Sequence, residues 1–365
     1  MTTYLLAGGG TAGHVNPLLA VADRLREREP ASTILVLGTR EGLEARLVPE
    51  RGYELLTIAR LPFPRRPNRA ALRFPGALRR AVDEVRAMIR DRGVDVVVGF
   101  GGYASAPAYL AARAEGTPLA IHEANARPGI ANRLGARITE FVGVAFRGTR
   151  IRHGEFVGMP LRPEIERLDR FVARHEGVAF FGLDAEKPTL LVTGGSSGAK
   201  RINDTISAAI TLILGAGWQV VHVTGEYRDA IETDLPGYHV LKYCDRMDLA
   251  LAAADLCLGR AGTSTVAEVT GLGIASVFVP YAVGNGEQRF NAREAVEAGG
   301  AVLVSDADFT PQWVATELVA LLRSRATIAE MAARIATVGT LDGTDRMVAL
   351  VHRALAAGPG RIDSR

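Results

Sequence analysis

Three glycine-rich segments carry the residues of this chain that are best suited to chemistry on a phosphorylated ligand. The first is Gly8-Gly9-Gly10-Thr11-Ala12-Gly13-His14; the others are residues 194–200 and 259–265. Each follows a short apolar run and opens a helical pattern, so that backbone N–H groups at a helix start would face an anion. One such turn in the first half and two in the second predict a nucleotide diphosphate held between two α/β domains.

His14 and Glu268 are the ionisable side chains next to these turns. A helix start disfavours the imidazolium form, so we expect a neutral His14 that can accept a proton near pH 7, although a polar cap is the simpler alternative. Glu268 lies within two turns of the helix start after residues 259–265. Its carboxylate there either interacts with the helix dipole or accepts hydrogen bonds from ribose hydroxyls.

The composition of the chain fits two globular domains. Its 365 residues exceed one typical core, and its 48% hydrophobic and 23% charged residues exclude a mainly disordered chain. Neither a membrane-spanning stretch nor a basic signal-peptide region is apparent, so neither insertion nor export is expected. Cys244 and Cys257 form no disulfide framework and no metal motif, which fits a reducing cytoplasm.

Strands and helices alternate along the chain, which predicts parallel sheets covered by helices on both faces. The Gly- and Pro-rich residues 158–163 are the expected hinge. We expect an N-terminal domain over 1–160, a C-terminal domain over 161–340, and a helix and tail over 341–365 that return toward the first domain. Ligands bind at the carboxyl ends of such strands, so the site is expected in the cleft between the halves. Apolar runs place the strands at 4–7, 33–38, 94–99, 118–121, 141–145, 189–193, 218–223, 255–258, 275–279 and 301–304.

Two motifs suggest other enzyme classes. The pattern Gly8-x-Gly10-x-x-Gly13 matches the dinucleotide fingerprint, but the second strand ends in residues 38–40 (Gly-Thr-Arg) without the acidic residue that holds a ribose. The pattern Gly194-x-Ser196-x-Gly198 matches a hydrolase nucleophile elbow, for which Asp255 and His352 are the candidate partners. A phosphate-binding turn explains both motifs more simply.

Asp306-Ala307-Asp308 resembles the Asp-x-Asp metal motif of one class of glycosyltransferases. It lies far in sequence from the phosphate turns, and the chain has no other cluster of metal-ligating residues. We therefore expect a solvated loop there, with no metal site and no cofactor.

Residues 60–80 contain seven arginines and no acidic residue, interleaved with leucine and phenylalanine. A solvated basic segment is one explanation. The other is a peripheral membrane contact, in which arginines meet anionic lipid and apolar side chains enter the interface. Nucleic acid is not expected as a partner, because the segment lacks regularly spaced stacking aromatics and a known binding module.

Six longer motifs make the chain similar to the MurG family, the UDP-N-acetylglucosamine:undecaprenyl-diphospho-muramoyl-pentapeptide N-acetylglucosaminyltransferases. The resemblance covers nearly the whole chain and implies the GT-B fold, two Rossmann-like domains whose parallel sheets face a central cleft. It implies inverting, metal-independent transfer of N-acetylglucosamine from UDP to lipid I, which forms lipid II for peptidoglycan. The motifs are Gly9–Val15, Gly99–Tyr103, Ile121–Asn125 with Pro128–Asn132, Gly194–Ala199, Arg260–Glu268 and Asn285–Ala292.

The resemblance also implies the roles of individual residues. His14 is the expected base, with His122 and Glu123 as alternative bases or orienting groups. Gly10, Gly101, Gly102 and Tyr103 would receive the diphosphate of the lipid acceptor. The donor would be bound by Thr11, Ala12, Gly13 and Asn125 (N-acetylglucosamine), Ser196, Thr263, Ser264, Thr265 and Arg162 (diphosphate), Glu268 (ribose), Gln288 (sugar hydroxyls) and the segment around Cys244 (uracil), with Gly262, Val266 and Met247 as further substrate-binding residues.

The implied setting is the cytoplasmic face of the plasma membrane, where residues 60–80 would contact anionic lipid and cell-wall synthesis proteins would be further partners in growth and division. The chain departs from many members at Ala12, Ala124, Ser197, Asn285 and Glu287. A specialised GT-B enzyme with an antibiotic or another lipid-linked acceptor, a UDP-sugar 2-epimerase and a silent UDP-sugar binder are therefore the alternatives. Acceptor-dependent release of UDP would distinguish them.

Overall fold

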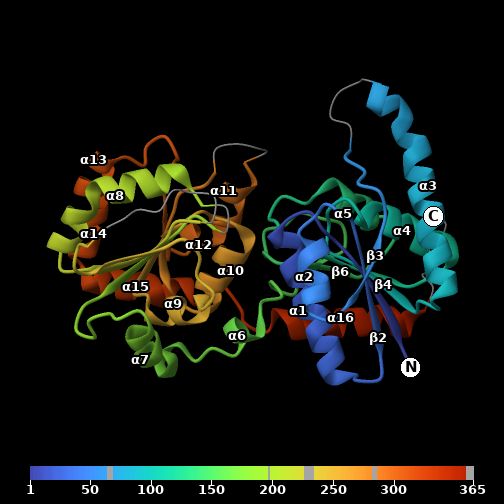
Figure 1. Cartoon of the computed structure of the whole chain (residues 1–365), viewed down its shortest axis with the longest axis horizontal. Coiled ribbons are helices and arrows are strands. Elements are labelled where there is room, and N and C mark those ends of the chain that lie inside the picture. The colour runs from blue at the N-terminus through green and yellow to red at the C-terminus, as the bar shows by residue number, and fades with distance from the viewer. Residues whose placement is uncertain (64–68, 196–197, 226–233, 282–285, 359–365) are drawn as a thin grey trace. The chain divides into compact units, whose positions relative to one another are not determined.

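The chain folds into two α/β units (Figure 1), which we describe separately. The computed structural model describes residues 1–63, 69–195, 198–225, 234–281 and 286–358. Unit 1 comprises Met1–Arg162 and Asp342–Arg365, and unit 2 comprises Pro163–Leu341. Each unit is built on one parallel sheet, so the prediction of two Rossmann-like α/β sheets is confirmed.

The sheet of unit 1 has the strand order β3-β2-β1-β4-β5-β6-β7, and all neighbours are parallel. The carboxyl ends of β1, β4 and β5 therefore lie at one edge, and the residues that follow them meet there. The strands are β1 (Thr3–Ala7), β2 (Thr33–Gly38), β3 (Glu54–Thr57), β4 (Val96–Gly99), β5 (Leu119–Glu123), β6 (Val142–Val144) and β7 (Gly154–Phe156).

Helices cover both faces of this sheet. Successive strand side chains point to opposite faces, so Leu6 packs in one buried cluster with α1 and α16 while Leu5 packs in another with α3 and α4. The C-terminal helix α16 is tied to α1, because both Arg24 and Arg28 bind Asp345. The helices are α1 (Ala12–Arg28), α2 (Glu44–Glu50), α3 (Arg69–Asp91), α4 (Ser105–Glu115), α5 (Ile130–Gly135) and α16 (Gly343–Ala357).

Unit 2 has a second parallel sheet, in the order β10-β9-β8-β11-β12-β13. Its strands are β8 (Thr189–Thr193), β9 (Gln219–Val223), β10 (Tyr238–Leu241), β11 (Leu256–Gly259), β12 (Ala275–Phe278) and β13 (Ala301–Leu303). Its helices are α6 (Pro163–Glu166), α7 (Arg170–Phe180), α8 (Lys200–Gly215), α9 (Met247–Ala253), α10 (Thr263–Gly271), α11 (Glu287–Asn291), α12 (Arg293–Glu297), α13 (Pro311–Trp313), the π-helix η1 (Val314–Leu318), α14 (Val319–Leu322) and α15 (Arg325–Ile335).

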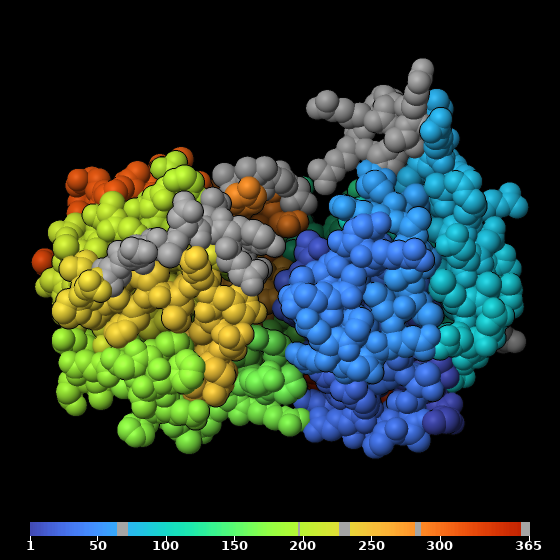
Figure 2. All heavy atoms as spheres, viewed as in Figure 1, coloured from blue at the N-terminus to red at the C-terminus, as the bar shows by residue number. Residues whose placement is uncertain are grey.

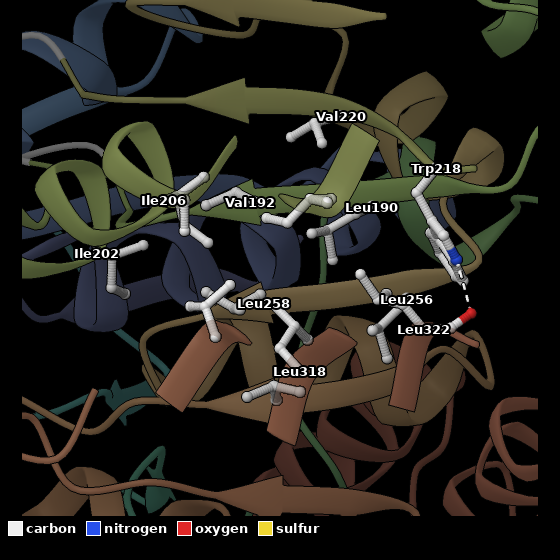
Figure 3. Close-up of a cluster of buried hydrophobic side chains, with 14 of the residues drawn as sticks. Leu190, Val192, Ile202, Ile206, Trp218, Val220, Leu256, Leu258, Leu318 and Leu322 are labelled. Carbon is white, nitrogen blue, oxygen red and sulfur yellow. Dashed lines mark hydrogen bonds between the residues drawn. The ribbon is translucent and has the colours of Figure 1, made fainter. Parts of the chain in front are cut away.

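One face of this sheet is covered by α8 and by the helices from α13 to α15. Figure 3 shows Leu190 and Leu258 among the side chains buried there. Trp218 closes one end of the cluster, and its indole N–H donates a hydrogen bond of 2.8 Å to the Leu322 carbonyl. The buried indole therefore leaves no unpaired donor.

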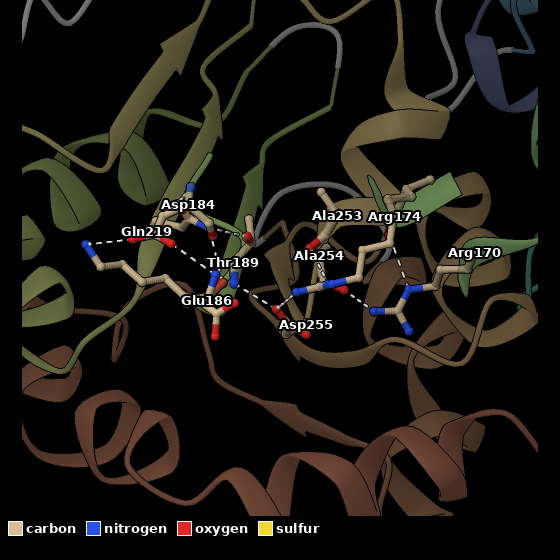
Figure 4. Close-up of polar contacts among 11 residues, drawn as sticks. Arg170, Arg174, Asp184, Glu186, Thr189, Gln219, Ala253, Ala254 and Asp255 are labelled. Atoms are coloured by element: carbon tan, nitrogen blue, oxygen red, sulfur yellow. Dashed lines mark hydrogen bonds and ion pairs between the residues drawn. The ribbon is translucent and has the colours of Figure 1, made fainter. Parts of the chain in front are cut away.

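A polar network holds the amino ends of β8 and β11 (Figure 4). Asp255 accepts hydrogen bonds from the Arg174 guanidinium, at 2.9 Å, and from the Thr189 N–H, at 2.8 Å. Gln219 donates to the Thr189 hydroxyl at 3.1 Å. This network lies at the end of the sheet opposite to the glycine turns, so it stabilises the unit rather than forming part of the site.

The apolar pattern predicts ten of these strands but not β3, β7 and β10. All three missed strands lie at the edges of their sheets. Their side chains are largely half-buried or exposed, so they lack the continuous apolar run of a central strand.

Candidate functional site

The first glycine-rich turn joins β1 to α1 in unit 1. Thr11 is the N-cap of α1, in extended conformation, and its side chain makes no capping hydrogen bond. The Thr11 carbonyl accepts the first helical bonds, from the N–H groups of His14 and Val15, both at 3.0 Å. The helix therefore begins directly after the glycines, as the sequence indicates, and presents His14 in its first turn.

His14 is half-buried and bound to the turn that precedes it. Its Nδ1 lies 3.2 Å from the Gly9 carbonyl oxygen and 3.3 Å from the Thr11 hydroxyl. A carbonyl oxygen only accepts, so Nδ1 carries the proton in the neutral ring, and Nε2 is the basic nitrogen. The ring edge that contains Nε2 packs on Gly101, where an added Cβ would lie 3.1 Å from this atom.

A buried carboxylate binds the backbone of this turn, and no feature of the sequence predicted it. Glu44, at the start of α2, is fully buried, and it accepts hydrogen bonds from the Gly10 N–H at 2.8 Å, the Thr39 N–H at 2.9 Å and the Thr39 hydroxyl at 2.8 Å. Burial acts to raise the pKa of this carboxyl, but these hydrogen bonds hold the pKa below its ordinary value. In the sequence, Glu44 is an acidic residue six positions after the end of β2, and no motif around it indicates a buried carboxylate.

The turn after β4 lies against the first turn. Gly101 and Gly102 have φ of +86° and +89°, which favour glycine, and a Cβ on Gly102 would lie 2.3 Å from the Gly9 carbonyl oxygen. The Tyr103 ring lies 3.8 Å from the Cβ position of Gly10. The guanidinium of Arg60 stacks 4.7 Å from the centre of this ring. The structure thus brings together Gly10, Gly101, Gly102, Tyr103 and His14.

Glu123 and His122, the two other candidate bases, are buried at the end of β5. Glu123 accepts hydrogen bonds from the Asn125 N–H at 2.8 Å, the Gly129 N–H at 2.9 Å and the Asn132 amide at 2.9 Å. Its pKa is raised by burial, against the effect of these bonds. The carboxylate therefore shapes the turn that presents Asn125.

His122 donates from Nε2 to the Gly158 carbonyl at 3.0 Å, and its Nδ1 has no partner among the described residues. Burial lowers the pKa of His122 to about 4, so the ring is neutral at physiological pH. Because His122 and Glu123 are both inaccessible, the geometry argues against either as the base. His14 is the candidate of the three that is accessible.

The second and third glycine-rich turns lie in unit 2. Gly194 has no room for a side chain, because a Cβ there would lie 2.3 Å from the Ala199 nitrogen. Ser196, a predicted phosphate ligand, lies outside the described residues. Gly262 is the N-cap of α10, with no described atom within 4 Å of an added Cβ. The N–H groups of Thr263 and of the next two residues open this helix next to a position that none of the described atoms fills, an arrangement that suits an anion.

Arg260 and Asn291 support the turn before α10, and the sequence analysis assigned neither a role. Arg260 is nearly buried, donates to the Val279 carbonyl at 2.9 Å and binds Asp306 at 2.5 Å. The Asn291 amide donates to the Ala261 carbonyl at 3.2 Å. Asp306, first of the Asp-x-Asp pair, is therefore an ion-pair partner of Arg260 and not simply solvated.

The remaining residues predicted to bind the donor follow strands of unit 2, apart from Arg162, which belongs to unit 1. Gln288 accepts a hydrogen bond from the Tyr281 N–H at 2.9 Å, which fixes its side chain. Glu268 is half-buried on α10. The pKa of the Cys257 thiol is raised to about 12, mainly because Cys257 is buried and in part because of the negative charge of Glu268. Cys244 is buried before Met247, the first residue of α9, and Arg162 is half-buried at the end of the first segment of unit 1.

The residues weighed for other enzyme classes have structural partners. Asp255 binds Arg174, whereas His352 of unit 1 binds Glu29 at 2.7 Å. Arg40 donates to the Thr57 hydroxyl at 3.3 Å. Within the described ranges no group of three or more His, Cys, Asp or Glu side chains is placed to hold a metal ion.

The α3 segment of unit 1 combines exposed arginines with exposed apolar side chains. Leu72 is 84% exposed and Phe63 is 55% exposed, and Phe63 packs edge-on against Phe74 at 5.3 Å. Arg73 and Arg79 are also exposed. The first turns of α3 extend beyond the rest of unit 1 in Figure 1, and α3 lies on the surface in Figure 2. None of the helices that the structure describes is long and apolar enough to cross a membrane.

Residues 4–144 match the glycosyltransferase family 28 N-terminal domain, and residues 189–347 match its C-terminal domain. A UDP-N-acetylglucosamine–N-acetylmuramyl-(pentapeptide) pyrophosphoryl-undecaprenol N-acetylglucosamine transferase of Leifsonia xyli is 63% identical over 98% of this chain and 100% of its own. The crystal structure of Acinetobacter baumannii MurG matches with a TM-score of 0.80 at 29% identity, over 97% of this chain and 100% of that chain.

A putative UDP-N-acetylglucosamine 2-epimerase from Listeria monocytogenes has a TM-score of 0.66 at 14% identity, over 96% of both chains. At this identity the match shows a common fold alone.

Proposed function

The chain belongs to glycosyltransferase family 28, and from this membership we propose that it is a MurG-type enzyme that converts lipid I to lipid II. It transfers N-acetylglucosamine from UDP to the 4-hydroxyl of the N-acetylmuramoyl residue. The observation that carries the proposal is the identity of 63%, over nearly all of both chains, to a transferase named for this reaction. The glycine turns and His14 supply groups that such a transfer requires.

His14 takes the proton of the acceptor hydroxyl. As the hydroxyl oxygen attacks the anomeric carbon, a bond forms between them, the bond from that carbon to UDP breaks, and the proton moves to Nε2. The hydrogen bond from Nδ1 to the Gly9 carbonyl supports this role, because it leaves Nε2 as the basic nitrogen of the neutral ring. Inversion at the anomeric carbon follows from this single displacement.

The start of α10 stabilises the departing UDP. Its first N–H groups and the hydroxyls of Thr263–Thr265 bind the diphosphate beside Gly262, where the open space suits phosphate oxygens. Glu268 binds the ribose, and Gln288 binds the sugar hydroxyls. Ser196 and Arg162 assist at the diphosphate, Cys244 with Met247 lies at the uracil, and Val266, whose N–H donates to the Gly262 carbonyl, helps to form the start of α10.

The paired turns of unit 1 bind the other substrate groups. Gly10, Gly101, Gly102 and Tyr103 receive the diphosphate of lipid I. Their glycines allow a close approach of backbone to phosphate, and Gly101 and Gly102 have φ values at which a side chain would be strained. Asn125, with Thr11, Ala12 and Gly13, contacts the N-acetylglucosamine, and the bond from Asn125 N–H to Glu123 positions that side chain.

The proposed reaction is tested by measuring UDP release from UDP-N-acetylglucosamine with and without a lipid I analogue. We expect release that depends on the acceptor, and much slower release from UDP-N-acetylgalactosamine. Release without acceptor would instead indicate an epimerase or a hydrolase. Tight donor binding with no release would mean a different acceptor or a silent binder, and either result would overturn the assignment.

The basic segment over residues 60–80 holds the enzyme at the cytoplasmic face of the membrane, where its lipid substrate lies. Arg73, Arg79 and Arg80 are exposed on α3 near Leu72, so cationic and apolar groups are presented together. Each arginine near an anionic surface contributes about 1 kcal/mol, so removal of three weakens binding by roughly a hundredfold at low salt. Other cell-wall synthesis proteins are further partners at this surface.

Sedimentation with vesicles tests this membrane contact. We expect the protein to bind vesicles that contain phosphatidylglycerol but not pure phosphatidylcholine. We expect Arg73→Ala, Arg79→Ala and Arg80→Ala together to weaken binding by roughly a hundredfold at low salt. The charge-matched control replaces Arg46, Arg133 and Arg353, which are exposed elsewhere on unit 1. Equal losses in both triple variants would mean that total charge, and not this segment, sets the affinity.

A further inference from the structure

We propose that the buried carboxylate of Glu44 orients and polarises His14 through the peptide group that joins Gly9 to Gly10. Glu44 is then a positioning residue that acts on the base without touching substrate. The inference rests on the proposed function, because it takes His14 as the base. Its central observation is that one peptide group is bound on one side by a carboxylate and on the other by an imidazole.

The two hydrogen bonds use the two ends of the same amide. The Gly10 N–H donates to Glu44 Oε2 at 2.8 Å, and the Gly9 carbonyl oxygen accepts from His14 Nδ1 at 3.2 Å. The peptide is trans, as are all described peptides, so its N–H and C=O point in opposite directions. Glu44, the amide and the imidazole therefore form a continuous chain of donors and acceptors.

The carboxylate in this chain is ionised and held in place. Glu44 is fully buried, yet its hydrogen bonds from Gly10 and Thr39 favour the charged form. Glycines line its position: an added Cβ would lie 2.3 Å from a Glu44 oxygen at Gly9, 2.1 Å at Gly42 and 2.5 Å from the Glu44 Cγ at Gly38. A side chain at any of these three glycines would therefore overlap the Glu44 side chain.

A fixed negative charge on this side of the amide has two consequences for His14. It polarises the peptide, which makes the Gly9 carbonyl a stronger acceptor and favours the tautomer with the proton on Nδ1. It also stabilises the imidazolium that forms when Nε2 takes the proton. A carboxylate bound directly to a histidine has these effects in a serine-protease triad, and here the peptide group separates the two.

Several other ionisable groups lie near Glu44 and His14 and could affect the pKa of His14. His122 on β5 interacts electrostatically with His14, but its pKa of about 4 keeps it neutral in the working range. Arg60 interacts with Tyr103 and with both Glu41 and Glu44. Arg60 is exposed, so its charge is screened by solvent more strongly than that of the buried carboxylate.

The test compares Glu44→Gln with the matched variant Glu29→Gln. Glu29 also binds a histidine, His352, but lies at the far end of α1. We expect Glu44→Gln to lower kcat by roughly ten- to a hundredfold, with little change in the KM for the donor. This is the range observed in metalloenzymes when a residue that orients a histidine ligand is replaced. The acid limb of the kcat/KM profile should move down by roughly one pH unit, because the imidazolium loses a favourable charge.

A second readout does not depend on turnover. In ¹⁵N NMR of the wild-type enzyme, we expect the neutral ring of His14 to carry its proton on Nδ1 and to titrate at higher pH than in Glu44→Gln. Glu29→Gln should titrate like the wild type. If the wild type carries the proton on Nε2, or if the titration is the same in Glu44→Gln, the inference is wrong.

The variants also separate this inference from the proposed function. If His14→Ala abolishes transfer while Glu44→Gln keeps the wild-type kcat and pH profile, the base assignment stands and the relay fails. If no variant and no wild-type enzyme releases UDP with acceptor, the function fails while the NMR titration still tests the relay. If Glu44→Gln does not fold, Glu44→Asp keeps a buried charge but shortens its reach, and we expect the same direction of shift.

Discussion

The turn before α1 and the turn before α10 share one backbone plan, a strand, glycines and a helix start, but they rest on different buried groups. Glu44 lies behind the first turn and binds the N–H of Gly10. Arg260 lies behind the second, where it binds backbone carbonyls and Asp306. The first support carries a net negative charge. The second is an ion pair.

The difference fits two tasks in one displacement reaction. A negative charge behind the first turn stabilises a histidine that gains a proton. The ion pair behind the second turn is neutral as a pair, so it does not repel a diphosphate at the N–H groups of α10. In the proposed reaction, similar glycine motifs would therefore serve a side-chain base in one unit and an anionic leaving group in the other.

Removal of the base should give the largest effect. We expect His14→Ala to lower kcat by about 10²- to 10⁴-fold while the Kd for UDP stays within twofold, because the contacts proposed for UDP, apart from Arg162, belong to unit 2. The measurements are steady-state turnover with a lipid I analogue and calorimetric titration with UDP. His352→Ala, which removes a histidine from the opposite end of unit 1, should retain activity. Loss of UDP affinity in His14→Ala would show that the two turns are not separate in their tasks.

Paired glycine substitutions sharpen the comparison. Gly101 has φ of +86° and contacts the His14 ring, so Gly101→Ala should cost about 1–2 kcal/mol of stability and displace the base, with kcat lower by roughly a hundredfold. Gly262 has ordinary φ and ψ of −66° and 153° and open space around it. Gly262→Ala should therefore lower the melting temperature only slightly, because alanine is a weaker N-cap than glycine, and raise the Kd for UDP about tenfold, because the methyl group occupies the proposed phosphate position.

The measurements are the melting temperature, the kcat and the Kd for UDP of both glycine variants. The reverse pattern, in which Gly262→Ala unfolds and Gly101→Ala retains its kcat, would contradict the roles assigned to the turns.

The central strands and the glycine turns could be predicted from the sequence, because a buried parallel strand is a continuous apolar run and a helix start after glycines has a local pattern. The edge strands β3, β7 and β10 could not, because their half-exposed residues resemble loops. In the site, too, the residues that belong to a local sequence pattern could be predicted, and those brought in by the fold could not. His14 is contiguous with its glycines, whereas Glu44 reaches Gly10 from 34 residues away through the fold.

The supports of the site were missed for the same reason. Asn291 and Arg260 act on backbone carbonyls that no sequence pattern specifies. Glu123 was predicted as an alternative base or orienting group from the family resemblance of the motif Ile121–Asn125. Its burial and its contacts with Asn125, Gly129 and Asn132 become visible only in three dimensions.

The comparison between units extends to two buried histidines, His122 and His222, whose pKa values burial lowers to about 4. In the unfolded chain a histidine titrates near 6.5, so between pH 6.5 and 4 the unfolded state binds more protons and stability falls as the pH falls. From pH 7 to 6 each histidine should cost about 0.7 kcal/mol, as the unfolded form becomes protonated. This effect is the smallest that we predict.

The two tryptophans make this effect assignable, because Trp218 and Trp313 both lie in unit 2. We expect urea unfolding followed by tryptophan fluorescence to lose part of its pH dependence in His222→Asn and to keep it in His122→Asn. The pH-dependent difference is the quantity to compare, since either substitution also changes absolute stability. If both variants alter the fluorescence transition equally, the units unfold as one cooperative body, and the separate supports of their turns are thermodynamically coupled.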